Sequence, residues 1–141
     1  MNAKTYLRQY KELEARVRRY RERIEQIETL KGIDLDGMPR GTSLGDPTKN
    51  AALNLALLKE SLGYAIIEAE ETRQRIASLI EKMKDPKHKE LLYSRYLLLL
   101  PWTEVVERLN IFRPGREYEL KHIIGYMHMQ ALKEFEEIIG E

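Results

Sequence analysis

Two long segments of this chain repeat apolar side chains at alternating spacings of three and four residues, which restricts the folds open to it. In residues 3–31 the repeat consists of Tyr6, Tyr10, Leu13, Val17, Tyr20, Ile24 and Ile27. In the segment from Pro47 to about Lys84 it consists of Leu55, Leu58, Leu62, Ala65, Ala69, Thr72, Ile76, Leu79 and Met83. This spacing gathers the side chains on one stripe of an α-helix, and such a stripe has to be buried against another helix. We therefore predict a long antiparallel helical hairpin over residues 1–84, and we expect a homo-oligomer formed through residues 3–83.

The segment between the two helices reads as a glycine-rich loop over residues 32–46, with four glycines and little periodicity. Gly32 occupies a position where a left-handed cap ends many helices. Asp46-Pro47 then predicts the start of the second helix, because aspartate accepts hydrogen bonds from free N–H groups and proline needs none at the first helical position. Asp85-Pro86 repeats the same start signal.

The C-terminal third reads as three further helices separated by short breaks. Their predicted bounds are Pro86 to about Leu99, Trp102 to Leu109, and about Arg116 to Ile138. The breaks fall at Pro101 and at Pro114-Gly115. Short helices in this order are typical of helix-turn-helix DNA-binding modules. The sequence thus predicts an all-α fold in which a helix-turn-helix domain over residues 85–141 follows the hairpin.

Several functional classes are disfavoured by the composition. The chain has no cysteine, which excludes disulfides, thiolate zinc sites and cysteine nucleophiles. Its histidines, His88, His122 and His128, lack the spacing of three or four that a helical metal pair needs. No strand, phosphate-binding glycine loop or serine-based catalytic pattern is evident, so we predict a protein that is not an enzyme and has no cofactor. Charged residues throughout the first turns and the lack of a long apolar run predict no membrane segment and a cytoplasmic protein.

Charge is distributed unevenly although the net charge is only +1. Residues 1–31 hold nine Lys and Arg against five Glu, including the basic run Arg16–Arg23. From Phe112 onward there are four basic residues against six acidic ones. Since neutralising phosphates supplies much of the affinity of DNA-binding proteins, Arg16–Arg23 is a second candidate phosphate contact, and the wet side of a coiled coil is the alternative.

The candidate DNA-reading residues lie on the exposed side of the last predicted helix and just before it. They are Arg113, Arg116, Tyr118, Lys121, His122 and Gln130. Arginine and glutamine side chains can bond guanine and adenine edges through two hydrogen bonds, and tyrosine and histidine can contact phosphate. The alternative interpretation is an ordinary solvated face of a helical bundle, which Glu117 and Glu119 favour.

Five stretches of the chain resemble known transcription proteins. Glu90–Tyr96 and Leu100–Leu109 resemble region 4 of bacterial sigma factors, where an arginine-tyrosine helix end precedes a helix that opens on tryptophan. Ala131–Phe135 resembles the closing helix of that module. Upstream, the N-terminal helix and the linker Gly41–Thr48 are similar to those of RinA/ArpU-type phage regulators of late genes.

The resemblance implies a phage or prophage regulator of transcription that binds promoter DNA through its C-terminal helix-turn-helix. Double-stranded DNA would be its partner, with RNA polymerase as a second partner. The alternative is a non-enzymatic helical adaptor that docks on RNA polymerase or on a phage packaging component. The DNA sequence, the sign of regulation and the oligomer number stay open.

Overall fold

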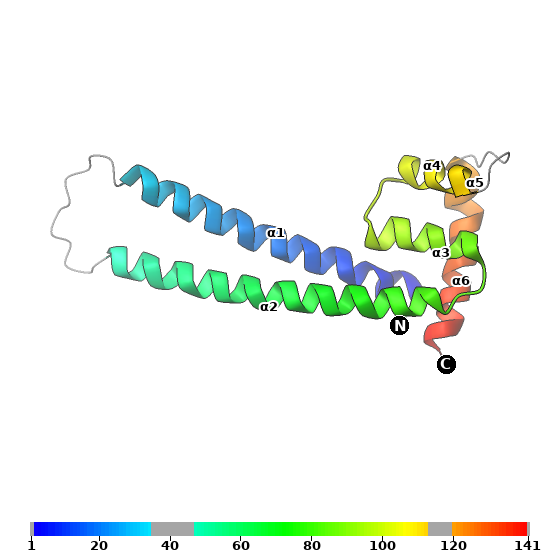
Figure 1. Ribbon diagram of the computed structural model, residues 1–141, viewed down its shortest axis with the longest axis horizontal. Helices are drawn as coiled ribbons and strands as arrows, with labels where there is room; N and C mark the ends of the chain where they lie inside the picture. The colour runs from blue at the N-terminus through cyan, green and yellow to red at the C-terminus, as the bar shows by residue number, and fades with distance from the viewer. Residues whose placement is uncertain (1, 35–46, 113–119, 141) are drawn as a thin grey trace. The chain divides into compact units, whose positions relative to one another are not determined.

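The computed structural model describes residues 2–34, 47–112 and 120–140, and regular structure in these ranges is entirely helical (Figure 1). The α-helices are α1 (Ala3–Asp34), α2 (Pro47–Glu81), α3 (Pro86–Leu92), α4 (Trp102–Phe112), α5 (Leu120–His122) and α6 (His128–Ile139). Two π-helical turns, η1 (Tyr93–Leu97) and η2 (Ile123–Met127), continue α3 and join α5 to α6. The predicted all-α fold is confirmed. None of the described helices has the length and apolar character needed to cross a membrane.

The residues pack into two compact units. One consists of residues 13–69, and the other combines residues 1–12 with residues 70–141. Both long helices therefore contribute to both units. The sequence predicts two domains that meet between residues 84 and 85. Whether residues 1–84 and 85–141 fold separately stays a prediction.

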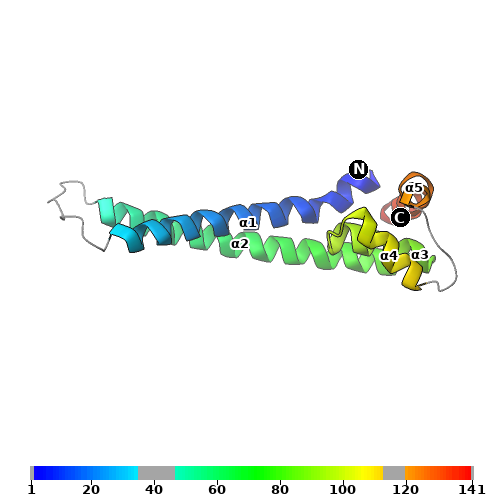
Figure 2. The same ribbon diagram turned by 90° about the horizontal axis from the view of Figure 1, so that it is seen from above.

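In the unit of residues 13–69, α1 and α2 lie side by side and run antiparallel (Figures 1 and 2). Arg16 Nη1 lies 3.5 Å from Glu68 Oε2, and Lys59 Nζ lies 3.2 Å from Glu28 Oε1. A residue later in α1 thus pairs with a residue earlier in α2, as expected for antiparallel helices. The buried side chains come from the predicted stripes and are Leu13, Val17, Ile24, Ala65 and Ala69. The predicted antiparallel pairing of these helices is confirmed.

The ends of α1 differ in how they follow the sequence signals. At its start the Asn2 side chain accepts a hydrogen bond from the Thr5 N–H at 2.8 Å, an N-cap that we did not predict. At its other end the helix continues past Gly32 to Asp34, so the predicted end at Gly32 is wrong. One glycine inside a helix costs only about 1 kcal/mol relative to alanine, which a 32-residue helix tolerates.

The unit that contains residues 70–141 has the larger core. Its fully buried large side chains include Leu7, Ile76, Ile80, Leu91, Leu92, Val105, Leu109, Ile123 and Phe135. The ring of Tyr6 packs against that of Phe135 with centroids 5.9 Å apart, which ties the first turns of α1 to α6. Ile123, Met127, Ala131 and Phe135 confirm the predicted core stripe of the last helix. Two other predicted core positions in that helix, Leu120 and Ile124, are about 40% exposed because they fall at the edge of the stripe.

The turn before α4 has a clear structural cause. The helix formed by α3 and η1 ends at Leu97, two residues before the predicted end, and Leu99 adopts the left-handed conformation with φ 57°. The Leu100 N–H donates to the Ser94 carbonyl at 3.0 Å, which closes the helix end. The Pro101 carbonyl then accepts from the first N–H groups of α4. The predicted start of α3 is confirmed, because the Asp85 side chain accepts from the Lys87 N–H at 2.9 Å.

A polar bridge fixes α4 against α3. The Arg108 Nε donates to Glu90 Oε1 at 2.7 Å and to the hydroxyl of the fully buried Ser94 at 3.1 Å. That hydroxyl in turn donates to Glu90 Oε1 at 3.0 Å. Arg108 therefore joins the two helices that hold the last helix in place.

Candidate functional site

The last helix, Leu120–Ile139, presents one side to solvent along its first three turns. Its exposed residues there are Lys121, His122, Gly125, Tyr126, Met129 and Lys133. The rings of His122 and Tyr126 stack with centroids 5.5 Å apart. We call these six residues the outward face of the last helix. An alanine Cβ at Gly125 would meet no atom within 4 Å, so the backbone itself is open to an approaching molecule there.

The predicted DNA-reading residues fall into three groups. Arg113, Arg116 and Tyr118 lie outside the described residues. Lys121 and His122 are neighbours in α5, and both are exposed on the outward face. Gln130 lies on the flank of that face and is half-buried. The structure thus brings Lys121 and His122 together, and contact of any of the six with DNA stays a prediction.

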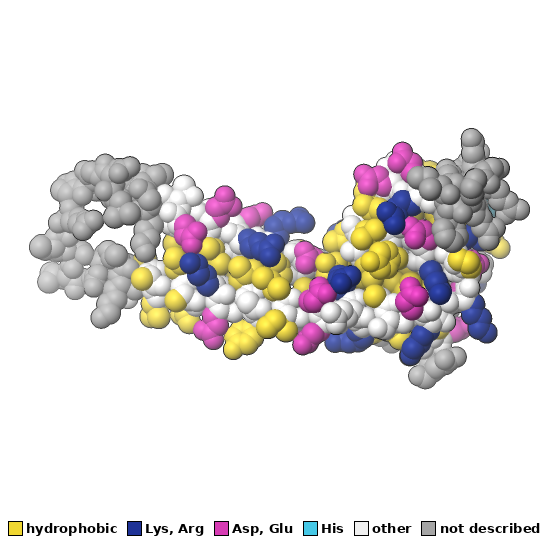
Figure 3. All heavy atoms as spheres, viewed as in Figure 1, with side chains coloured by type: hydrophobic (Ala, Val, Ile, Leu, Met, Phe, Trp, Pro, Cys, Tyr) yellow, Lys and Arg dark blue, Asp and Glu magenta, His cyan; other side chains and the backbone are white. Residues whose placement is uncertain are grey.

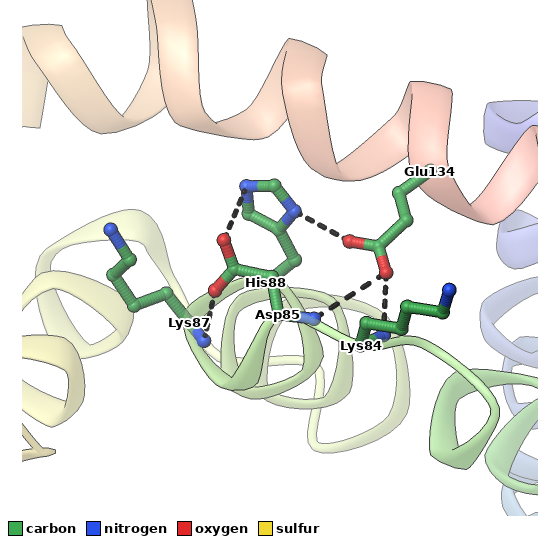
Figure 4. Close-up of polar contacts among 5 residues, drawn as sticks. All are labelled: Lys84, Asp85, Lys87, His88 and Glu134. Carbon is green, nitrogen blue, oxygen red and sulfur yellow. Dashed lines mark hydrogen bonds and ion pairs between the residues drawn. The ribbon is translucent and has the colours of Figure 1, made fainter.

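Acidic residues are absent from this part of the helix. Between Leu120 and Lys133 the sequence contains no Asp or Glu, and the acids begin at Glu134. The Glu134 carboxylate reaches the start of α3 (Figure 4). Its Oε2 accepts from the Lys84 N–H at 2.6 Å, and its Oε1 lies 2.8 Å from His88 Nδ1. From Leu120 to Lys133 the last helix itself therefore brings no carboxylate to a polyanion on the outward face.

The environment of Glu134 keeps it ionised. Burial raises the pKa of the Glu134 carboxyl, but hydrogen bonds from the Lys84 N–H, the His88 ring and the Asp85 N–H outweigh burial and leave the pKa below its usual value. The His88 Nε2 lies 3.6 Å from Asp85 Oδ2, so the imidazole stands between two carboxylates. This network stabilises the packing of α6 on the start of α3.

A basic pocket of about 290 Å³ adjoins the last helix within the unit of residues 1–12 and 70–141. It is lined by Lys4, Arg8, Lys11, Arg95, Tyr96, Leu99, Trp102, Ile124 and His128. Three of its cations come from α1, where positions 4, 8 and 11 share one side of a helix. The fourth, Arg95, comes from η1. We call this cavity the basic pocket.

The floor of the basic pocket is aromatic. The Arg95 Nη1 donates to the Leu100 carbonyl at 3.0 Å, and its guanidinium carbon lies 4.6 Å from the centroid of the Trp102 ring. The Trp102 ring meets that of His128 edge to face, with centroids 4.8 Å apart. The Tyr96 hydroxyl and His128 Nε2 are joined by a hydrogen bond of 2.7 Å.

The positive charges of the pocket affect the pKa values of His128 and Tyr96, which also line it. The pKa of His128 is lowered to about 4, first by burial and then by Lys4, Arg95 and Arg8. The imidazole is therefore neutral at pH 7. Burial raises the pKa of Tyr96, against the opposing effect of Arg8 and Arg95. The cations and the buried rings thus form one electrostatic unit.

The pocket cations of α1 are functional candidates that we did not predict. The sequence predicts a candidate phosphate contact at Arg16–Arg23 instead. That run belongs to the unit of residues 13–69, and its first member, Arg16, pairs with Glu68. The spacing of Lys4, Arg8 and Lys11 on one helix side was the available signal. That Arg95 would join them depends on tertiary packing.

The surface of α2 within residues 13–69 carries an exposed apolar face (Figure 3). It consists of Leu53, Ala56, Leu57, Gly63, Tyr64 and Ile67, with Glu60 as its one charged member. Tyr64 is 68% exposed, an unusual value for an aromatic side chain. The exposed residues of α1 in the same unit are mostly charged, as at Arg18, Arg19 and Glu22. We call this surface the α2 face.

Metal binding finds no support in the described part of the chain, where no group of three or more His, Asp or Glu side chains could hold an ion. Comparisons of the chain with models of known protein families, with curated proteins and with solved structures found no match. The resemblance to RinA/ArpU-type regulators therefore stays a prediction that rests on the motifs quoted above.

Proposed function

We propose that this protein is a phage- or prophage-encoded transcriptional regulator that binds promoter DNA in the host cytoplasm and is not an enzyme. The observation that carries the proposal is the outward face of the last helix, which follows α4 as a recognition helix follows the first helix of a helix-turn-helix. That face is exposed, bears two lysines and holds no acid from Leu120 to Lys133. Such a helix can enter the major groove without repulsion from phosphates.

The individual side chains suit contacts of different kinds. Lys121 can neutralise a phosphate or bond a guanine edge, and His122 can donate to a phosphate. Gln130 can bond an adenine edge from the flank. The bare backbone at Gly125 permits close approach of the DNA. Arg113 and Arg116, which precede this helix in the chain, would add cationic contacts, and Tyr118 would add a hydrogen bond to a phosphate.

Self-association through the hairpin belongs to the same proposal, because two modules bind two half-sites. The α2 face supports a second copy of the chain as its occupant. Leu53 and Ile67 lie seven positions either side of Glu60, and Leu57 and Tyr64 lie three and four positions either side. An antiparallel contact between two α2 helices therefore sets the same side chains against each other from both copies, as a two-fold interface requires.

Binding of labelled duplex DNA to the purified protein tests the proposal, measured at about 50 and 200 mM salt. We expect binding at the lower salt that weakens steeply at the higher salt. The variant Lys121→Gln with Lys133→Gln removes two cations from the outward face and should reduce the salt slope by about two. The control is Arg75→Gln with Lys82→Gln, which removes two exposed cations that do not belong to that face. Equal losses in both variants, or no DNA binding at low salt, would refute the proposed interface.

A second candidate function is a non-enzymatic adaptor that docks on RNA polymerase or on a phage packaging component. The observation that favours it is the apolar content of the same helix surface, where Tyr126 is 58% and Met129 is 52% exposed. Exposed apolar groups of this size commonly mark protein interfaces. Failure to bind DNA, together with binding to purified RNA polymerase that Tyr126→Glu abolishes, would favour the adaptor.

A further inference from the structure

Three departures from regular helix geometry meet at the basic pocket. Arg95 and Tyr96 belong to the π-helical turn η1, and Ile124 belongs to the π-helical turn η2. Leu99, with φ 57°, is in the left-handed region, which is unfavourable for a branched side chain. π-helical turns and strained backbone are concentrated at functional sites, because a helical bundle has no need of them for packing alone.

Four cationic side chains are among the residues that line the pocket. Within the described ranges, none of Lys4, Arg8, Lys11 and Arg95 forms an ion pair with a carboxylate. These like charges line one cavity beside His128, whose pKa is lowered first by burial and then by Lys4, Arg95 and Arg8. An anion in the pocket would remove the repulsion among these charges, and low-dielectric walls would strengthen its attraction.

The size and walls of the pocket limit the kind of anion. Its volume of about 290 Å³ exceeds what a single inorganic ion needs and lies at the lower end of small-molecule sites, which span about 300–1,000 Å³. Guanidinium groups suit phosphate oxygens because they donate two parallel hydrogen bonds. The rings of Tyr96, Trp102 and His128 offer stacking or edge contacts to a planar group.

We propose that the basic pocket binds a small phosphorylated molecule with a planar ring, of the nucleotide class. Lys4, Arg8 and Lys11 hold the phosphate groups. Trp102, with Arg95 against its ring, and Tyr96 contact the planar ring. The site uses none of the residues of the outward face, so it does not depend on the DNA-binding function proposed above.

Trp102 allows a direct test, because it is the only tryptophan of the chain and lines the pocket. Its fluorescence is followed while the full chain is titrated with ADP, with adenosine and with inorganic phosphate. We expect a saturable change with ADP, a weaker response to inorganic phosphate, and none with adenosine at the same concentrations. Calorimetric titration with ADP should give the same dissociation constant.

Matched variants connect the signal to the cations. Arg8→Gln with Lys11→Gln should weaken ADP binding about tenfold or more, since each side chain provides a charge-assisted hydrogen bond. Arg75→Gln with Lys82→Gln makes the same change in two exposed residues outside the pocket and should leave the affinity unchanged. All four positions are exposed, and circular dichroism should give the same helix content for both variants.

Three outcomes would overturn the proposal. The first is the absence of a saturable fluorescence or calorimetric response to ADP. The second is equal weakening in the two double variants, which would indicate non-specific attraction to positive charge. The third is quenching of Trp102 by duplex DNA with no response to ADP or inorganic phosphate, which would assign the pocket to the DNA backbone instead of a free ligand. Loss of DNA binding in Lys121→Gln with Lys133→Gln, with ADP binding kept, would leave the proposal standing.

Discussion

The Glu134 carboxylate and the His88 imidazole, 46 positions apart in the chain, meet with Oε1 2.8 Å from Nδ1. The same carboxylate accepts hydrogen bonds from the Lys84 and Asp85 N–H groups through Oε2. These N–H groups belong to the link between α2 and α3, where no helix carbonyl accepts them. Glu134 thus joins α6 to a bend of the backbone, and it does so as an ionised acceptor (Figure 4).

Replacing Glu134 by Gln should destabilise the protein by about 1–3 kcal/mol, because an amide weakens hydrogen bonds that the charged carboxylate accepts. Urea unfolding followed by circular dichroism at pH 7 measures the change. Glu136→Gln alters an exposed carboxylate on the same helix and should change stability by less than about 0.5 kcal/mol.

Acid should remove the same stabilisation. Because the folded-state pKa of Glu134 is below the usual glutamate value of 4.5, its contribution to stability is fully present above that pH and is lost as the pH falls through the lowered pKa. The stability difference between the native chain and Glu134→Gln should therefore shrink below pH 4.5. A difference that is constant from pH 7 to the acid transition would contradict this account.

His128 should make stability depend on pH in a higher range. Its folded-state pKa of about 4 lies below the usual histidine value of 6.5, so the unfolded chain binds the proton more tightly. Stability should accordingly fall as the pH decreases from 6.5 toward 4, by about 3 kcal/mol over the whole interval. Unfolding free energies between pH 7 and 5 test this without interference from Glu134. The variant His128→Gln, which can still hydrogen-bond Tyr96, should lose most of the slope.

Gly125 should be replaceable by alanine with a gain in stability. Its Cβ would meet no neighbour within 4 Å, and alanine favours the helix over glycine by about 0.5–1 kcal/mol. A thermal-unfolding midpoint raised by a few degrees would confirm the prediction. Gly125→Glu should keep the helix content and abolish DNA binding, since it places a carboxylate on the outward face. Unchanged DNA affinity in Gly125→Glu would move the interface elsewhere.

The α2 face should control self-association. Tyr64→Glu puts a second charge on the face, four positions from Glu60, and should dissociate the oligomer in sedimentation equilibrium. Gln26→Glu adds the same charge to an exposed position of α1 and should leave the mass unchanged. Glu60→Ala should strengthen association, because two copies of Glu60 approach each other near the two-fold axis. A native chain that is monomeric at high concentration would rule out this interface.

Local signals in the sequence predicted the helices well because they depend on neighbouring residues only. Asp85 caps the helix with its side chain, and the ring of Pro86 fixes a helical φ angle. Accordingly, α3 begins at Pro86 as predicted. The apolar repeats likewise predicted the pairing of α1 with α2. They did not predict that Leu7, outside the heptad seam, is fully buried. A heptad pattern assumes one partner helix, whereas the first turns of α1 contact α6 through Tyr6 as well.

The basic pocket could not be predicted for a related reason. Its walls come from α1, η1, the turn at Leu99 and the last helix. Apart from η1 and the turn at Leu99, these segments are far apart in the sequence, so local sequence patterns do not reveal that they meet. The left-handed conformation of Leu99 was hidden too, because glycine or asparagine is the usual signal for it. Two of the DNA-reading candidates, Lys121 and His122, are by contrast predicted to share one side of a single helix, and they do share that side.

The packing of Tyr6 against Phe135 joins two residues that are synthesised far apart in time, so this contact forms late. Ribosomes add about 5–20 residues per second, so the first turns of α1 emerge roughly 6–25 seconds before the aromatic ring that covers them is made. During that interval the Tyr6 ring has no Phe135 ring to pack against. The core that contains α6 can therefore close only after translation has passed residue 135.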